Sequence, residues 1–449
     1  MNEEEETFDP ETFMDHFKNL NSAALNLTEE QLQISREVEI LENDQVFNEL
    51  DYRVSESEVL SAIKQLKLDK SAGLDCILNE MIKAGQCGLL HPILKLFNLI
   101  LSTGNYPTEW SLGKIIPLHK KGSRDDPSNC TGITISSCLG KLFNSILNAR
   151  LTSFLDKNDL LAKEQIGFRK KHRTSDHMFI VKTIMDKYKR SRKQLFLCFV
   201  DFRKAFDTVW HVGLLYKLLK LGMPNKFYGV IKNMYQNVLL AVQCKSNHLT
   251  PSFPSYVGVR QGDNLSPTLF NIFVNDIPSL FEDCAPPSVG QMTIPCLLYA
   301  DDLLILSENE SGLNNALSRL NRYCETWGLE VNTTKTKYMC LNPDKKSPSP
   351  KISFSSTVIE CVQSFTYLGI EFSSDGAFNI AKKLLYKKAL KVYFKISKTL
   401  RPSPQVDTML HLFDHLMKPI LMYGSEIWGV SNLNFKMAFP KPGDLKSQF

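Results

Sequence analysis

Two apolar runs in this chain are each joined directly to aspartate, and this arrangement limits the possible folds more than any other feature. Residues 195–200 form an unbroken apolar segment that ends at Asp201, which predicts a fully buried strand with a carboxylate at its end. The run 297–306 is interrupted by Asp301 and Asp302, as in a hairpin with the acidic pair at its turn. Charge is costly in such places unless it is neutralised. Divalent metal ions would neutralise it, so the three acids fit a two-metal phosphoryl-transfer site, with ordinary turn or cap residues as the alternative.

The rest of the chain alternates helical and extended patterns, which predicts an α+β fold. A capping-box pattern at Ser55 and Glu58 begins a helix that stops before position 71. Further helices are expected at about 76–102, 139–155, 212–221, 222–240 and 267–280. Strands or extended segments are expected at 115–118 and 251–259.

Acidic residues are concentrated at the start of the chain. Residues 1–50 contain fourteen acidic and two basic residues, a local charge of −12, whereas the whole 449-residue chain has a formal charge of +5. The remainder is therefore strongly basic, which suits a polyanionic partner such as nucleic acid; a solvated basic surface is the alternative. The first 50 residues have few apolar side chains, so we expect a helical or loose extension without catalytic residues.

The composition also excludes several classes of protein. No apolar stretch approaches the roughly 20 residues of a membrane span. Four consecutive glutamates near the start stand where a secretory signal would have basic and apolar residues. The eleven cysteines include no C-x-x-C pair, which argues against a zinc ribbon or a disulfide framework. We therefore expect an intracellular protein with reduced thiols and no membrane segment.

Seven short motifs follow one another along residues 67–370. Two surround the acids, namely FVDFRKAFD at 199–207 and YADD at 299–302. The others are KSAGLD at 70–75, QIGFR at 165–169, GVRQGD with LSP at 258–267, WGL with NTTKTK at 327–337, and FTYLG at 365–369. In this order they resemble the motifs of the reverse transcriptases of non-LTR (LINE-type) retrotransposons.

The resemblance implies a right-hand polymerase with fingers, palm and thumb, in which the palm has an RRM-like antiparallel sheet and the thumb is helical. It implies an RNA-directed DNA polymerase that adds dNTPs to a DNA 3′ end on an RNA template by two-metal phosphoryl transfer. Asp201, Asp301 and Asp302 would hold two Mg²⁺ ions, or Mn²⁺ in their place. RNA template, DNA primer and dNTPs are the implied partners. No protein partner is evident, and nuclear action follows from the family alone.

The resemblance also assigns residues to the nucleotide. Phe206 is implied to be the aromatic gate against a ribose 2′-hydroxyl, and Lys335 the lysine that protonates the leaving pyrophosphate. Gln261 and Gly262 would contact the nucleotide, because glycine lets the backbone approach closely. The alternatives are a core phenylalanine, a surface lysine and an ordinary turn.

The resemblance further implies that Lys120 and Lys121 offer cations to the triphosphate and that Arg169 lies in the motif that contacts template or nucleotide. Charge-assisted contacts to phosphate favour such residues. The chain departs from the family at Thr131, where many members have an arginine. A threonine supplies no guanidinium. Either Lys120, Lys121 or Arg169 compensates, or nucleotide affinity is reduced in a decaying copy.

The final section, 380–401, is a lysine-rich helical pattern without acidic residues. Lys383, Lys387, Lys391 and Lys395 recur every four positions, with Leu384, Ala389, Val392 and Ile396 expected on another face. Such a stripe would follow a template–primer backbone as a thumb does, with a solvated helix face as the alternative.

The predicted divisions are an acidic extension at 1–50, a helical fingers extension at 51–106, a fingers and palm domain at 107–371, a partial helical thumb at 372–430 and an irregular tail at 431–449. Because no endonuclease or metal knuckle is visible, we expect a fragment or gene model of one element.

Two rival functions stay open. Thr131 and the truncated ends favour a catalytically decayed nucleic-acid-binding remnant. An RNA-directed RNA polymerase is the other rival, and Phe206 together with Tyr299-Ala300 speaks against it.

Overall fold

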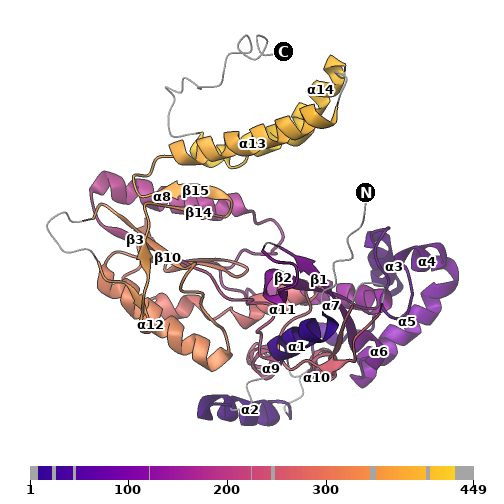
Figure 1. The fold of residues 1–449 in the computed structure, drawn as a ribbon. Helices are drawn as coiled ribbons and strands as arrows, with labels where there is room; N and C mark the ends of the chain where they lie inside the picture. Colours follow the sequence, from indigo (N-terminus) through magenta and orange to yellow (C-terminus); the bar gives the residue numbers. More distant parts are fainter. Residues whose placement is uncertain are drawn as a thin grey trace.

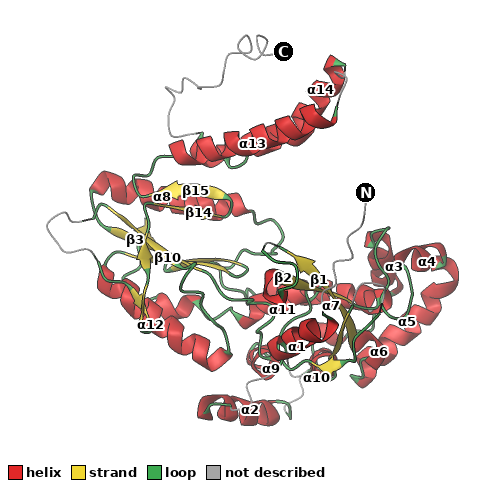
Figure 2. Cartoon of the chain, viewed as in Figure 1, coloured by secondary structure: helices red, strands yellow, loops and turns green. Residues whose placement is uncertain are grey.

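The computed structural model describes residues 9–429 apart from 23–26, 44–46, 121, 224, 244–247, 344–349 and 401–404. Helices and short strands alternate along these residues, which confirms the predicted α+β class (Figure 2). Figure 1 shows a helix-rich half around β1 and β2, a half built on β3 and β10, and the long helix α13 beyond the β14–β15 hairpin. Within the described ranges, no helix is both long and apolar enough to cross a membrane. The predicted tail at 431–449 and Lys121 lie outside the described residues.

The central sheet has five strands in the order β13-β10-β3-β9-β8. Its core strand β3 (Leu195–Val200) pairs antiparallel with β9 (Asp302–Ser307) and β10 (Lys337–Leu341), while β8 (Cys296–Tyr299) pairs antiparallel with β9. When the four antiparallel strands are numbered along the chain, their order across the sheet is 4-1-3-2, with helices in both crossovers, which is the ferredoxin-like arrangement. The RRM-like sheet expected from the sequence is therefore confirmed. The short edge strand β13 (Glu360–Cys361) pairs parallel with β10.

The unbroken apolar run of β3 results from burial on both faces of the sheet. Phe196, Cys198 and Val200 belong to the larger hydrophobic core, whereas Leu195, Leu197 and Phe199 belong to the smaller core on the other face. Successive side chains of a strand point to opposite faces, so a strand covered on both sides needs apolar residues throughout.

A second sheet has the order β2-β1-β4-β5. In it β1 (Leu112–His119) pairs antiparallel with β2 (Cys130–Ile135) and parallel with β4 (Leu239–Val242), and β4 pairs antiparallel with β5 (Phe253–Pro254). Helices α3 (Glu56–Gln65), α5 (Gln86–Thr103), α7 (Cys138–Lys157) and α10 (Lys226–Gln236) contribute to the same core as the second sheet. One continuous core thus connects the two sheets.

The acidic N-terminal segment is helical, which was one of the two predicted alternatives, and it is packed against the fold rather than loose. Helix α1 (Pro10–Leu20) begins at the capping residue Asp9 and buries Phe13 and Phe17, which are 1% and 4% exposed. Helix α2 (Glu29–Leu41) buries Ile34 and Val38 and packs on α9 (His211–Lys220). Few apolar residues suffice here because each pair is spaced by four positions and lies on one helix face.

The C-terminal helix α13 (Asn379–Thr399) buries Ala381, Leu385 and Ala389, and the first two belong to the smaller core. The sequence pattern placed Leu384 on the apolar face, but this residue is 38% exposed. The true apolar stripe follows the spacing 381, 385, 389, and Lys383, Lys387, Lys391 and Lys395 lie two positions away from it. All four lysines are exposed, on the face of α13 opposite the core.

Three predicted helices differ in extent. The helix expected at 76–102 is interrupted at Gly85, between α4 (Asn79–Ala84) and α5. The helix expected to reach position 240 ends at Gln236, because residues 239–242 pair with β1. The segment 267–280 contains α11 (Ser266–Phe273) and, after a turn, the 3₁₀ helix η4 (Pro278–Phe281). Short apolar runs suit either a helix or a strand, so tertiary pairing decides.

The remaining elements complete the described part of the chain, and neither α8 nor α12 among them, nor β2 above, was predicted from the sequence. They are η1 (Glu49–Asp51), α6 (Thr108–Ser111), η2 (Pro127–Asn129), α8 (Thr174–Ser191), β6 (Ser288–Val289), β7 (Met292–Thr293), α12 (Glu310–Trp327), β11 (Ser353–Phe354), β12 (Thr357–Val358), β14 (Ser364–Tyr367), β15 (Ile370–Ser373), α14 (Val406–Leu412), η5 (Phe413–Met417), α15 (Lys418–Leu421) and α16 (Ser425–Trp428).

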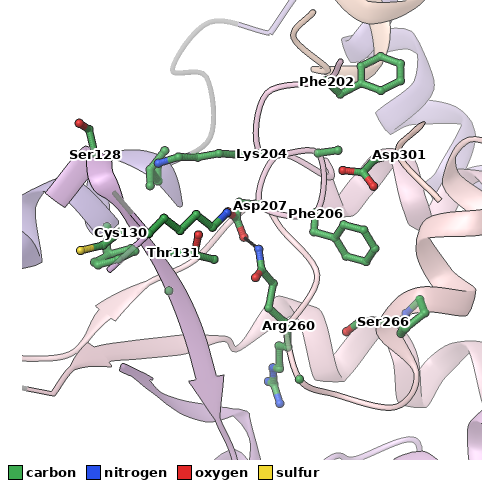
Figure 3. A pocket seen from close by; sticks show the side chains of 18 of the residues that line it. Ser128, Cys130, Thr131, Phe202, Lys204, Phe206, Asp207, Arg260, Ser266 and Asp301 are labelled. Atoms are coloured by element: carbon green, nitrogen blue, oxygen red, sulfur yellow. Dashed lines mark hydrogen bonds between the residues drawn. The ribbon is translucent and has the colours of Figure 1, made fainter. Parts of the chain in front are cut away.

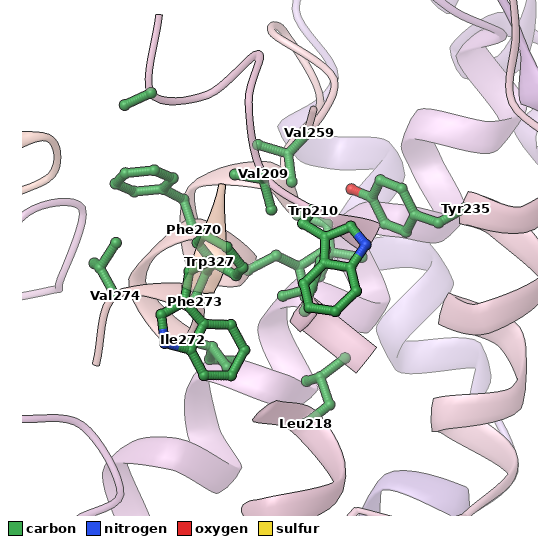
Figure 4. Close-up of a cluster of buried hydrophobic side chains, with 14 of the residues drawn as sticks. Val209, Trp210, Leu218, Tyr235, Val259, Phe270, Ile272, Phe273, Val274 and Trp327 are labelled. Atoms are coloured by element: carbon green, nitrogen blue, oxygen red, sulfur yellow. The ribbon is translucent and has the colours of Figure 1, made fainter. Parts of the chain in front are cut away.

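One charged side chain lies inside the larger core. Lys217 on α9 donates to Asp276 Oδ1 at 2.7 Å, to Tyr323 Oη at 2.6 Å and to the carbonyl of Phe273, and its ammonium lies 3.8 Å from the centroid of the Trp327 ring. Figure 4 shows Trp327 and Phe273 in this aromatic cluster. Burial lowers the pKa of Lys217 to about 8, although Asp276 partly offsets this effect.

We expect Lys217→Met to leave the free energy of unfolding within about 1 kcal/mol of the parent, because methionine keeps the apolar stem and Tyr323 still donates to Asp276. Lys217→Ala should cost about 2–4 kcal/mol through the cavity it leaves. Urea denaturation checks both values. The parent should also gain stability relative to the Met variant between pH 8 and 10.5, because only unfolded Lys217 stays protonated there. Equal losses in both variants would show that the charge itself stabilises the fold.

Candidate active site

The central sheet brings the three acids to one place. Val200 pairs with Leu303 across β3 and β9, so one further step in this antiparallel register sets Asp201 beside Asp302. Tyr299 pairs with Asp302 at the end of the β8–β9 hairpin, which leaves Ala300 and Asp301 as the turn. Ala300 has φ of +56°, a conformation that residues other than glycine adopt uncommonly. The predicted hairpin with the acidic pair at its turn is therefore present.

The three carboxylates repel one another. Burial, followed by the charges of Asp301 and Asp201, raises the pKa of Asp302 to about 6. Burial and Asp201 also raise the pKa of Asp301, while its own backbone N–H and Lys120 partly oppose the shift. Raised carboxyl pKa values mean that the folded chain holds negative charge at a cost, which a bound cation would relieve.

Lys335 is the cation that neutralises Asp201 in this structure. Its Nζ lies 3.4 Å from Asp201 Oδ2, a buried oxygen that has no hydrogen-bond partner. The loop that carries Lys335 is tied to the end of β3, since Asn332 donates its N–H to the carbonyl of Asp201 at 2.8 Å and Asp201 donates its N–H to Thr336 Oγ1 at 3.1 Å.

The carboxylates fit divalent cations as hard oxygen ligands. The buried Asp201 oxygen that lacks a hydrogen bond and the mutual repulsion of the carboxylates both favour a bound cation at this site. In the described part of the chain, no three His, Cys, Asp or Glu side chains are grouped so as to hold a metal ion by themselves. Any ion held here would thus take further ligands from elsewhere.

Gln165 and Gly167 hold the Ala300 turn in place, a role that the sequence motif did not reveal. The fully buried amide of Gln165 accepts from the N–H groups of Ala300 at 3.0 Å and Gly167 at 2.9 Å, and it donates to the carbonyl of Ala300 at 3.2 Å. Gly167 is so close that a Cβ there would lie 2.2 Å from Ala300 N. The bridge between Gln165 and Leu298 of β8 joins residues far apart in the sequence, so no local pattern could predict it. The only local sign was a glycine two positions after a glutamine.

A cavity of about 660 Å³ opens beside the acids (Figure 3). Asp201 and Asp301 lie on its wall with Lys335, and it extends to Lys120, Thr131 and Gly132 on the second sheet. The predicted residues Phe206, Gln261 and Gly262 line it as well. Phe17 and Leu20 of α1 also line it, so the N-terminal segment, where no catalytic residue is expected, forms part of the cavity wall.

Two of the predicted nucleotide residues are held firmly at this cavity. The ring of Phe206 stacks on Phe270 with centroids 4.5 Å apart and meets Phe168 edge to face at 6.2 Å. Gln261 donates through Nε2 to Asp207 Oδ1 at 2.8 Å. Burial raises the pKa of Asp207, although Gln261 and two lysines oppose the shift. Gly262 has φ of +103°, which requires glycine.

A second cavity of about 660 Å³ lies on the other side of the acids. Asp201 and Lys335 line both cavities, while Asp302 lines only this one. Its far wall is the β14–β15 hairpin, whose turn at Leu368 and Gly369 also lines the cavity, and Phe365 of this hairpin stacks on Phe199 of β3 at 4.3 Å. The three acids thus lie between the two cavities.

Arg169 is not brought to either cavity, which corrects its predicted place at the nucleotide. Its guanidinium donates to the carbonyls of Ala162 and Gln165 and lies 3.6 Å from Asp156. These contacts within the protein hold the guanidinium away from both cavities. Lys383, Lys387, Lys391 and Lys395 are on α13 and do not line these cavities.

Comparison with known proteins identifies the family. The family model described as reverse transcriptase (RNA-dependent DNA polymerase) matches residues 118–372, more than half of the chain. The chain belongs to the reverse transcriptase family. This domain contains both sides of the acidic site, and the predicted relationship to the polymerases of non-LTR elements is confirmed.

Among the relatives of this reverse transcriptase, the probable RNA-directed DNA polymerase from transposon BS of Drosophila melanogaster is 29% identical over 83% of this chain and 42% of its own length. The RNA-directed DNA polymerase from mobile element jockey of the same species is 27% identical over 84% and 42%. The retrovirus-related Pol polyprotein from element R2 of Popillia japonica is 27% identical over 73% and 46%. The chain thus spans less than half the length of these curated relatives.

A solved structure of apo telomerase from Candida tropicalis, truncated from its C-terminal domain, is similar with a TM-score of 0.44 and 13% identity over 68% of this chain and 62% of that one.

Proposed function

We propose that this chain is an RNA-directed DNA polymerase that adds dNTPs to a DNA 3′ end on an RNA template. The observation that carries the proposal is the position of the acids between two cavities of equal size. The cavity with Phe206 and Gln261 suits a nucleoside triphosphate, and the cavity beside the β14–β15 hairpin suits a primer terminus. Because Asp201 lines both, a bond between the two occupants would form next to it.

Asp201, Asp301 and Asp302 would hold two Mg²⁺ ions, or Mn²⁺ in their place. When bound, such ions make the primer 3′-hydroxyl more acidic and stabilise the leaving oxygen. Oxygens of the nucleotide would complete the ligand set, in keeping with the lack of a three-residue metal cluster in the described ranges. Lys335, released from Asp201, would protonate the pyrophosphate as it leaves.

Nucleic acid would lie along the basic face of α13, where Lys383, Lys387, Lys391 and Lys395 are exposed without an intervening acid. This proposal treats residues 372–430 as a partial thumb, 107–371 as fingers and palm, and 51–106 as a fingers extension. A chromosomal DNA primer would place the reaction in the nucleus. We propose the RNA template and the DNA primer as partners of this chain, which spans 42% of the length of its relative from transposon BS.

Phe206→Val is expected to weaken discrimination against ribonucleotides by about 10- to 100-fold, because removing the ring opens space for the 2′-hydroxyl. The measurement is the ratio of kcat/KM for dTTP and rUTP on an RNA template. Phe168→Leu is the matched control, since this ring touches Phe206 but does not line the cavity. An unchanged ratio in Phe206→Val would show that the ring is an ordinary core residue.

Primer extension tests the proposed function. The purified chain should extend an oligo(dT) primer on poly(rA) with dTTP and Mg²⁺, and use rUTP poorly. Preferred use of rUTP would instead indicate an RNA-directed RNA polymerase. No extension, together with salt-sensitive binding of the hybrid in a gel shift, would indicate the nucleic-acid-binding remnant.

A further inference from the structure

We infer that Lys204 binds the β- and γ-phosphates of the incoming dNTP and supplies the positive charge that Thr131 lacks. This inference rests on the proposed function, because it names the residue that recognises the triphosphate in the same cavity.

Lys204 lies on the loop that carries two other residues of the site. It follows Asp201 by three positions and precedes Phe206. It lines the cavity that Phe206 and Gln261 also line. The loop is a tight turn in which Asp207 donates its N–H to the carbonyl of Lys204 at 2.7 Å. Lys204 has φ of +45°, a backbone conformation that costs on the order of 1 kcal/mol in a residue with a side chain and is found mainly where a function requires it.

The ammonium of Lys204 is directed to the side of the cavity where a cation is missing. In Figure 3 its side chain reaches from the loop after β3 toward η2, which carries Ser128, and the start of β2, which carries Cys130 and Thr131. Asp301 lies on the other side of the same cavity, also in Figure 3. A triphosphate with its α-phosphate near the acids would therefore extend its outer phosphates toward Lys204.

The charges around Lys204 favour an anion. Its hydrogen-bond partner is the imidazole Nε2 of His16 on α1 at 3.3 Å, which supplies no negative charge. Burial lowers the pKa of Lys204, Asp207 raises it, and the charge of Lys120 lowers it further. The carboxylate of Asp207 is already hydrogen-bonded to Gln261. Two ammonium groups thus face one cavity and share the carboxylate of Asp207, and a bound polyanion would relieve their repulsion.

Two of the other three cations that line this cavity are engaged. Arg260 donates to the carbonyls of Trp110 at 2.8 Å and Ser111 at 3.2 Å, and its side chain is buried. Lys335 is paired with Asp201. Lys204 and Lys120 remain for the phosphates, and Lys204 is the one fixed to the loop of Asp201 and Phe206.

Single-nucleotide incorporation of dTTP on poly(rA)·oligo(dT) tests the inference. Lys204→Ala should raise KM for dTTP by about 10- to 100-fold with a smaller effect on kcat, as expected for a lost charge-assisted contact. Lys204→Arg should stay within about fivefold of the parent, since it keeps the charge. Adding Thr131→Arg to Lys204→Ala should recover most of the loss. Arg203→Ala is the matched control, because the neighbouring Arg203 is exposed and paired with Glu330 at 2.7 Å.

Calorimetric titration with Mg·dTTP and with dTMP gives a readout independent of catalysis. The parent should bind the triphosphate more tightly than the monophosphate, and Lys204→Ala should remove most of that difference. If the parent extends primers while Lys204→Ala behaves as Arg203→Ala, the inference is overturned and the proposed function stands. If the parent does not extend primers, the proposed function fails, and the titration still decides whether Lys204 binds the triphosphate.

Discussion

Gly167→Ala is expected to lower primer extension by about 100-fold or more. A methyl group at this position would stand 2.2 Å from the backbone nitrogen of Ala300 and 3.0 Å from Gln165 Oε1. Neither atom is free to move, because Gln165 is fully buried and its amide is hydrogen-bonded to both the N–H and the carbonyl of Ala300. The turn that presents Asp301 would shift, and small displacements at a reacting centre have large effects on rate.

The same substitution should destabilise the fold by about 1–3 kcal/mol, the usual cost of overpacking. Gly88→Ala is the matched control, since a Cβ at that position of α5 meets no atom within 4 Å. It should leave extension unchanged and raise stability by about 0.5–1 kcal/mol. Extension rates and urea denaturation of both variants measure the effects. Normal extension by Gly167→Ala would contradict the role of this segment as the support of the Asp301 turn.

The double variant Asp301→Asn, Asp302→Asn should lose extension by at least about a thousandfold, because the ligands for the metal ions and the charge they hold are both removed. In the absence of metal it should be more stable than the parent, with a melting temperature about 1–3 °C higher at neutral pH. The reason is that mutual repulsion and burial raise the pKa of both carboxyls in the folded chain.

The pH dependence of this gain has a definite sign. Asp302 has a folded pKa of about 6 and an ordinary value of 3.8, so the folded chain binds the proton more tightly than the unfolded chain does. The parent should therefore become more stable, relative to the variant, as the pH falls from about 7 toward 4. Mg²⁺ at pH 7.5 should raise the melting temperature of the parent alone. A variant that melts below the parent in EDTA would contradict the repulsion.

The sequence predicted the centre of the site because its signals there are local. Few alternative folds suit an apolar strand followed at once by Asp201 and an apolar hairpin broken by Asp301 and Asp302. The antiparallel register of β3 and β9 then brings these acids together. Phe206 and Gln261 were found through motifs, and both line the cavity beside Asp201 and Asp301. Their contacts with Phe270 and Asp207 come from residues distant in sequence, which no local pattern reports.

The errors arose where tertiary contacts override local pattern. Arg169 carries the right charge, but the carbonyls of Ala162 and Gln165 hold it away from the cavity. The N-terminal segment is polar on average, yet Phe13 and Phe17 anchor it against the fold and Phe17 reaches the cavity. Lys204 sits inside a motif known for its aspartate and phenylalanine, and only the direction of its side chain across the cavity distinguishes it from a surface lysine.

The most direct test of the central claim is primer extension on an RNA template with dNTPs and Mg²⁺, with the parent chain and the Asp301→Asn, Asp302→Asn variant side by side. Both proteins should bind the RNA–DNA hybrid in a gel shift, since the basic face of α13 is unchanged between them. We expect extension by the parent and none by the variant. Equal extension by both proteins would contradict the assignment of the acidic site between the two cavities as the site of DNA synthesis.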